Sequence, residues 1–159
     1  MDKSEADKVR TEGVPVWRSL GAALCLAGFL LGCDSYSDIR ATLSPSDEAR
    51  FSRGQREATA CWSCHDVTGS ALKVGPPLGG IMGRQVGVVP AFPYSDALRA
   101  SNWVWNEETL DLFLSAPQSL LPGNRMLSAP LLDSRRRGDL LFFLSRVSGE
   151  ENGPNSAQP

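Results

Sequence analysis

Cys61-Trp62-Ser63-Cys64-His65 decides the interpretation of this chain, because it places two thiols and an imidazole within one helical turn. At that spacing the two thiols can each add to a vinyl group of one porphyrin while His65 reaches its iron. The same Cys-x-x-Cys spacing occurs in thioredoxin-type redox pairs and in halves of zinc sites. A zinc site needs a second cluster, but Cys25 and Cys33 lie in an apolar run and His65 is the single histidine. The motif therefore predicts one covalent c-type haem attached to Cys61 and Cys64, with His65 as an iron ligand.

The segment before the motif indicates export. Residues 20–31 are uncharged and follow Trp17-Arg18, as the apolar part of a signal peptide does. The uncharged run between Arg18 and Asp34 is fifteen residues long, shorter than the ~20 that a spanning helix needs, so a transmembrane anchor is the second interpretation. Leu30-Leu31-Gly32-Cys33 resembles the lipobox of bacterial lipoproteins, which implies acylation of Cys33. We expect a membrane-anchored lipoprotein on the periplasmic side of a bacterial membrane, with a secreted, soluble periplasmic protein as the alternative.

The 159 residues are enough for one small domain between polar flanks. We expect residues 1–33 to be the export signal with its lipobox and residues 34–43 to be a polar tether. Residues 149–159 are rich in Gly, Pro, Asn and Glu, which predicts a disordered tail. The remaining segment, 44–148, is the predicted domain.

Cap residues and apolar spacing predict three main helices in this domain. Starts are marked by Ser44-Pro45, by Asn106-Glu107-Glu108 and by Asp133 or Ser134, and stops by the motif, by Pro117 and by Gly149. Residues 75–83 contain too much Gly and Pro for a helix or a strand interior, so they predict an irregular loop. The expected fold class is all-α, with three helices and loops wrapped around one haem.

From about Ser46 to Val147 the chain resembles the small class I monohaem cytochromes c of mitochondrial type, whose iron has His and Met ligands. The resemblance is carried by Gly75-Pro76-x-Leu78-x-Gly80-x-x-Gly83-Arg84-x-x-Gly87, Phe92-x-Tyr94-Ser95-x-Ala97, Pro122-Gly123-x-x-Met126 and Arg137-x-Asp139-Leu140-Leu141-x-Phe143-Leu144. It implies the cytochrome c fold, a haem c cofactor and an electron carrier that is not an enzyme.

The methionine ligand is expected to be Met126. Met1 is the initiator, which leaves Met82 and Met126. Met82 lies in the loop expected on the proximal side of the haem, whereas Met126 follows a Pro-Gly turn far enough along the chain to approach from the opposite face. A core-filling methionine is the alternative, and it suits Met82 better.

Four further residues are expected around the haem. The Pro76 carbonyl is the candidate acceptor for the ring N–H of His65, with an ordinary loop proline as the alternative. Arg84, Tyr94 and Trp105 each combine a donor with bulk, so they are candidate partners of the haem propionates or else ordinary core or surface residues.

The chain also departs from the family at several positions. Phe113 stands where a tyrosine hydroxyl usually reaches the methionine sulfur, and Asn124 replaces a hydroxyl residue near a propionate. Ser128 replaces an aromatic at the haem edge. Glu57 and Ala58 stand where the family has an aromatic shortly before the motif, which leaves open what packs against Phe143.

Two axial ligands leave no vacancy on the iron, so the favoured function is single-electron transfer between membrane-associated redox partners. The alternative is a haem peroxidase or redox-sensing module in which Met126 is displaced, although no second histidine exists for acid–base catalysis. Lysine occurs only at Lys3, Lys8 and Lys73, so a basic docking patch depends on Arg125, Arg135, Arg136 and Arg137. A net charge of −2 does not indicate nucleic-acid binding, and we expect a monomer.

Overall fold

The computed structural model of the chain describes residues 35–148. The expected export signal with Cys33, and the expected tail at 149–159, lie outside the described residues. Contacts divide the chain into residues 1–37 and residues 38–159, and the predicted haem-binding residues all belong to the second unit.

Helix α3 (Pro45–Ala58) begins where the sequence predicts the first helix. The Ser44 side chain accepts a hydrogen bond from the backbone N–H of Asp47 at 3.2 Å, and Pro45 occupies the first helical position. Phe51, Gly54 and Ala58 lie on one face of the helix and are buried. This face therefore carries the residues that pack against the rest of the domain.

A short helix, α2 (Ser37–Ala41), lies within the segment that the sequence predicts to be a tether. The guanidinium of Arg40 donates to Ser52 Oγ at 2.8 Å and to Gln55 Oε1 at 2.6 Å, and it pairs with Glu48. Arg40 therefore bonds this segment to α3, and polar composition alone did not reveal this.

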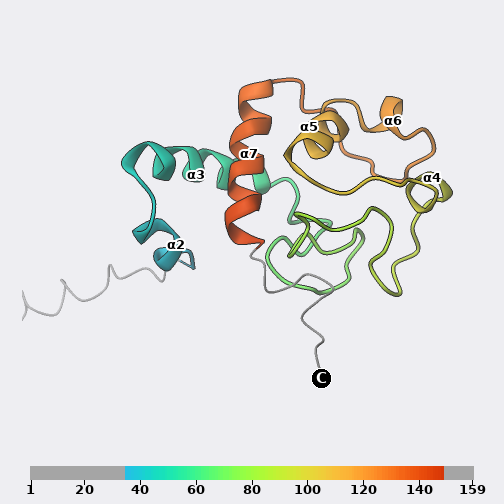
Figure 1. The fold of residues 1–159 in the computed structure, drawn as a ribbon, viewed down its shortest axis with the longest axis horizontal. Coiled ribbons are helices and arrows are strands. Elements are labelled where there is room, and N and C mark those ends of the chain that lie inside the picture. Colours follow the sequence, from blue (N-terminus) through green and yellow to red (C-terminus); the bar gives the residue numbers. More distant parts are fainter. Residues whose placement is uncertain (1–34, 149–159) are drawn as a thin grey trace, which may run out of the picture. The chain divides into compact units, whose positions relative to one another are not determined.

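Helix α7 (Ser134–Val147) crosses α3 and is in contact with it (Figure 1). Asp133 caps α7 by accepting a hydrogen bond from the N–H of Arg136 at 3.0 Å. The Phe51 and Phe143 rings pack with their centroids 5.0 Å apart. Phe51 is thus the aromatic partner of Phe143 that the sequence analysis did not identify, and it lies almost two turns before Ala58.

Ion pairs reinforce the α3–α7 contact. Asp139 is 6% exposed and accepts hydrogen bonds from Arg53 Nε at 2.6 Å and Arg53 Nη2 at 3.2 Å. Arg136 forms a second two-point pair with Glu57, at 2.9 and 2.7 Å. A buried carboxylate with two charge-assisted bonds fixes the register of the two helices.

Helix α5 (Glu107–Ser115) contributes to the main apolar core. Asn106 and Thr109 form a capping box at its start, with each side chain bonded to the other residue's backbone N–H. Leu110 and Phe113 are buried, and they belong to one cluster with four other residues: Ile81, Val86, Trp105 and Leu141. This cluster joins α5 and α7 to the loop region.

Two four-residue helices complete the described part of the chain: α4 (Asp96–Arg99) and α6 (Pro117–Leu120). Pro117 ends α5, as predicted, but it also begins α6. Residues 59–95 form loops and turns without a helix, and Gly83 and Gly87 in this stretch adopt positive φ angles of 78°. The predicted irregular loop at 75–83 is confirmed.

The all-α class is confirmed for residues 35–148, where Gln85 and Val104 form an isolated antiparallel bridge and no strand occurs. None of the helices in this range is long and apolar enough to cross a membrane.

Candidate functional site

The Cys-x-x-Cys-His motif directly follows the end of α3 and forms a helical turn of its own. The backbone N–H of Cys61 donates to the Ala58 carbonyl at 2.9 Å, and those of Cys64 and His65 donate to the Cys61 carbonyl at 3.1 and 2.9 Å. Both cysteines are free thiols, Cys61 partly buried and Cys64 exposed. Burial, followed by the charges of Cys64 and Glu57, raises the pKa of Cys61. The turn thus presents two thiols one turn apart.

The His65 ring is held by the loop that folds back under the motif. Its Nδ1 lies 2.6 Å from the Pro76 carbonyl oxygen. Because a carbonyl only accepts, Nδ1 carries the proton, and the lone pair is on Nε2. Burial lowers the pKa of His65, and the charge of Lys73 lowers it further, while the bond to Pro76 opposes both. A neutral imidazole with a free Nε2 is the form that binds a metal.

Gly75 lies against the same ring. A Cβ at Gly75 would stand 2.3 Å from His65 Cε1, 2.6 Å from Nδ1 and 2.8 Å from Nε2. The N–H of Gly75 also donates to the Cys64 carbonyl at 2.7 Å. Only glycine therefore lets the backbone pack this closely on the imidazole.

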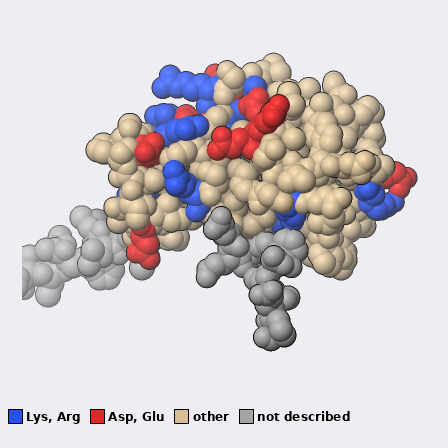
Figure 2. Space-filling model, in the orientation of Figure 1, with Lys and Arg blue, Asp and Glu red and all other residues tan. Residues whose placement is uncertain are grey.

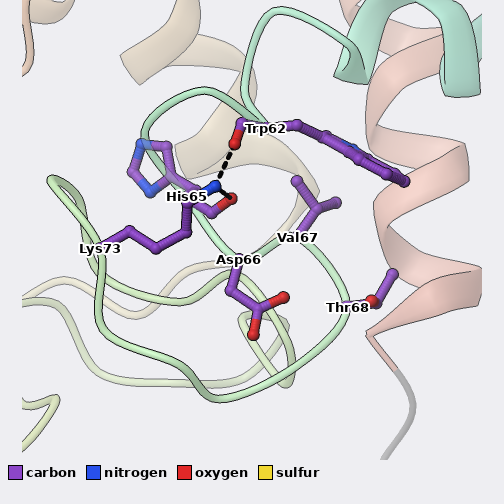
Figure 3. Close-up of a pocket in the computed structure, with 6 residues that line it drawn as sticks. All are labelled: Trp62, His65, Asp66, Val67, Thr68 and Lys73. Carbon is purple, nitrogen blue, oxygen red and sulfur yellow. Dashed lines mark hydrogen bonds between the residues drawn. The ribbon is translucent and has the colours of Figure 1, made fainter.

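Lys73 contacts the motif, a role that the sequence analysis missed. Its ammonium donates to the carbonyl of Trp62 and, at 3.1 Å, to that of His65 (Figure 3). A cavity of about 120 Å³ lies beside this contact, lined by Trp62, His65, Asp66, Val67, Thr68 and Lys73. The imidazole and the Trp62 indole point in opposite directions (Figure 3). The charge of Lys73 thus stabilises the carbonyl end of the turn. The one feature of the sequence that could have pointed to this role is that Lys73 is the single lysine after Lys8.

Met126 and Met82 are both partly buried against the apolar core. Met126 follows a turn in which Gly123 has a φ of 82°. The N–H of Met126 donates to Asn124 Oδ1 at 2.9 Å, and its carbonyl accepts from Gln118 Nε2 at 3.0 Å. Gln118 is a second residue that the sequence analysis missed.

Arg84, Tyr94 and Trp105 come together in the loop region. The Arg84 guanidinium donates to the carbonyls of Gly79 at 3.0 Å and Pro77 at 2.6 Å. Burial raises the pKa of Tyr94, and the charge of the nearby Arg84 opposes that shift. The Trp105 backbone accepts from the N–H of Gly83 at 2.8 Å and donates to the Arg84 carbonyl at 2.9 Å. Arg84 thus lies near the Tyr94 side chain and is bonded through its backbone to Trp105.

No protein-family model matches the chain, but individual relatives do. Over 84 residues it is 42% identical to cytochrome c type-1 of Ascaris suum, a match covering 53% of this chain and 75% of that protein. The chain belongs to the cytochrome c family. It is also 34% identical over 99 residues to cytochrome c2 of Rhodomicrobium vannielii, covering 62% of this chain and 79% of that one. Its structure is similar to that of cytochrome cH from Methylobacterium extorquens, with a TM-score of 0.56 and 27% identity over 59% of this chain and 95% of that one.

This cytochrome is therefore an electron-carrying protein with one covalent haem c, and it is not an enzyme. The residues of its motif fit that cofactor. Cys61 and Cys64 are free thiols on one turn, and the His65 imidazole is neutral with Nε2 available. Gly75 provides the close backbone support that keeps the ring in this orientation.

Proposed function

We propose that this cytochrome carries single electrons with His65 Nε2 and Met126 Sδ as the two axial ligands of its iron. The hydrogen bond from His65 Nδ1 to the Pro76 carbonyl at 2.6 Å carries the proposal, because it fixes the tautomer and aims Nε2. A haem iron with both axial positions filled by protein exchanges one electron without binding a substrate.

Each residue of the motif has one task in this proposal. Cys61 and Cys64 form the two thioether bonds that attach the porphyrin, and His65 supplies the proximal nitrogen. Pro76 orients that nitrogen and raises its donor strength by accepting the Nδ1 proton. Met126 supplies a thioether, which favours the reduced iron relative to a second imidazole.

Arg84, Tyr94 and Trp105 are proposed to face the haem propionates. A partly buried carboxylate needs donors around it. Arg84 supplies the positive charge of the group and lies near the Tyr94 phenol. Burial raises the pKa of Tyr94, which favours the protonated phenol. A protonated phenol can donate a hydrogen bond where a phenolate could not.

An enzymatic role through displacement of Met126 has little support around that residue. The charged side chain next to Met126 is Arg125, and its guanidinium donates to the Pro93 carbonyl. Phe113 is 5% exposed and packs on Trp105 with centroids 5.2 Å apart, so it brings no acid or base. The arrangement favours the carrier.

We infer a periplasmic protein anchored by an acylated Cys33. The bacterial relatives named cytochrome c2 and cytochrome cH support the compartment. The lipobox-like Leu30-Leu31-Gly32-Cys33 supports the anchor, and several acyl chains on one residue would hold the protein on a membrane without a spanning helix.

The redox partners are proposed to dock with little help from free basic side chains. On the face shown in Figure 2 the charged side chains gather over α3 and α7, while much of the remaining surface is uncharged. Two of the four arginines proposed as a basic patch are paired with carboxylates: Arg136 with Glu57 and Arg137 with Asp111, both at 2.7 Å. Paired charges project a weaker field than free ones.

Stopped-flow oxidation and reduction of the purified full chain by membranes from its own source tests this function. We expect reaction in both directions, with rate constants that change less than about tenfold between low and physiological ionic strength. A rate that falls steeply with salt would contradict the docking proposal. Absence of any electron exchange would contradict the carrier.

A further inference from the structure

Side chains hold both polar groups of the Met126 backbone. Its N–H donates to Asn124 Oδ1 at 2.9 Å, and its carbonyl accepts from Gln118 Nε2 at 3.0 Å. Gln118 lies on α6 before the Pro122-Gly123 turn, and Met126 lies after it. The turn is therefore closed by side-chain bonds that end on Met126.

Hydrogen bonds hold the Asn124 side-chain amide in one orientation. It is 5% exposed, and its amide nitrogen donates to the carbonyls of Pro117 at 2.7 Å and Leu121 at 2.9 Å. Both amide hydrogens are thus engaged, and a flipped amide would set its NH₂ group against the N–H of Met126. Gln118 Nε2 also contacts the Asn124 carbonyl at 3.1 Å and Asn124 Oδ1 at 3.3 Å.

These bonds change the expected role of Asn124. The resemblance to the cytochromes c implies that Asn124 lies near a propionate, where the family has a hydroxyl residue. With both N–H groups bonded to backbone carbonyls, the side chain has no donor left for a carboxylate. Its remaining acceptor faces Met126.

If Met126 leaves the iron, no histidine or lysine is expected to take its place as the sixth ligand. His65 is the single histidine, and Lys73 donates to the carbonyls of the motif. The other lysines, Lys3 and Lys8, precede the apolar run. An external ligand would therefore report directly on how often Met126 leaves.

We propose that Asn124 and Gln118 are positioning residues that clamp the Met126 backbone and so keep its sulfur on the iron. The inference rests on the proposed function, in which Met126 is the sixth ligand. The clamp acts through the backbone. It therefore sets how often Met126 leaves the iron and does not change the donor strength of its sulfur.

Cyanide binding to the ferric, haem-loaded full chain tests the clamp, because cyanide needs the position that Met126 occupies. We expect Gln118→Leu to raise the cyanide association rate roughly three- to tenfold, as loss of one net hydrogen bond would. Gln118→Arg restores an N–H donor without an iron-binding nitrogen and should return the rate toward wild type. Gln85→Leu, the same change at another exposed glutamine, should leave the rate unchanged. Gln118 is exposed, so its variants should fold even if an Asn124→Ala chain does not.

Two further measurements separate the possible failures. The midpoint of thermal unfolding reports a merely structural role: a lower midpoint in Gln118→Leu with unchanged cyanide binding would overturn the clamp. The ferric far-red band of methionine ligation reports the ligand itself. If wild type has the band and Met126→Ala loses it, wild-type cyanide kinetics in Gln118→Leu refute the clamp alone. If wild type lacks the band, the ligand assignment is wrong and the clamp is refuted with it.

Discussion

Gly54 of α3 lies directly on the backbone of Asp139 in α7. A Cβ at Gly54 would stand 2.0 Å from the Asp139 carbonyl oxygen and 2.7 Å from Phe143 Cβ. The contact brings Phe51 against Phe143 and Arg53 against Asp139. The close approach of the two helices thus depends on the absence of one side chain.

Gly54→Ala should lower the free energy of unfolding of the haem-loaded protein by about 3 kcal/mol, because backbone cannot move aside as a flexible side chain can. Gly138→Ala is the matched control in α7, where a Cβ would meet only Arg50 Nη2 at 3.7 Å. That change should stabilise the protein by ~0.5–1 kcal/mol through helix propensity. Denaturant unfolding checks both, and equal effects of the two substitutions would contradict the tight contact.

Covalent attachment of the haem is expected to depend on the thiols of the motif. A Cys61→Ala/Cys64→Ala double variant should lose haem staining after denaturing electrophoresis, because no other thiol lies on the same turn. His65→Ala should keep thioether bonds where it matures but lose the low-spin spectrum, since the chain has no second imidazole. Fully covalent haem in the double variant would refute the site.

The cap residues of the three main helices could be predicted from the sequence because each cap bonds to a residue in the same helical turn. Ser44 and Asp133 each bond an N–H three residues away, so their signal lies within one turn. The four-residue helices α4 and α6 were not predicted, because one turn has no apolar period to detect.

The site divides in the same way between local and distant signals. The motif turn and the loop below it were predicted from spacing and resemblance, and the structure places the Pro76 carbonyl at the His65 ring. Gln118 and Lys73 were missed because their bonds cross a turn or a loop: residue 118 reaches residue 126, and residue 73 reaches residue 62. Such contacts depend on how the loop closes, which composition does not encode.

Membrane association is expected to depend on Cys33, the proposed acylation site. Cys33→Ser should move the protein to the soluble fraction or leave it as an unprocessed precursor, because acyl chains are the proposed anchor. Cys25→Ser removes the neighbouring thiol of the same apolar run and should change neither result. Fractionation and labelling with a fatty acid are the measurements, and unchanged processing and membrane binding of Cys33→Ser would favour an uncleaved apolar anchor.

The reduction potential should respond to a hydroxyl at position 113. Phe113 is buried and stands where the family has a tyrosine whose hydroxyl donates to the methionine sulfur. Phe113→Tyr should raise the potential by about 40 mV, the equivalent of one net hydrogen bond in a one-electron couple, because a bonded sulfur donates less to ferric iron. Redox titration measures the shift. Phe142→Tyr, a buried position of α7 beside Arg50 and Arg146, is the control and should shift it little.

The identity of the sixth ligand distinguishes a carrier from an iron that is open to small molecules. Met126→Ala should remove the ferric far-red band, lower the reduction potential and open the iron to cyanide or peroxide, because the sequence has no second imidazole and Met82 is expected on the proximal side of the haem. Met82→Ala removes the same side chain from the same apolar cluster and should do none of these. Both substitutions leave a cavity, so similar losses of stability are expected and only the spectra and potentials should differ.

That equality is what makes the pair informative. If Met82→Ala removes the band and Met126→Ala keeps it, Met82 is the ligand. Met126, after the turn at Gly123, is then a packing residue. If both keep it, the sulfur comes from neither, and Met1, the remaining methionine, lies outside the described residues. If the unmutated protein lacks the band and turns over peroxide rapidly, the iron has an open position, and an electron carrier with two protein ligands is no longer the function that fits.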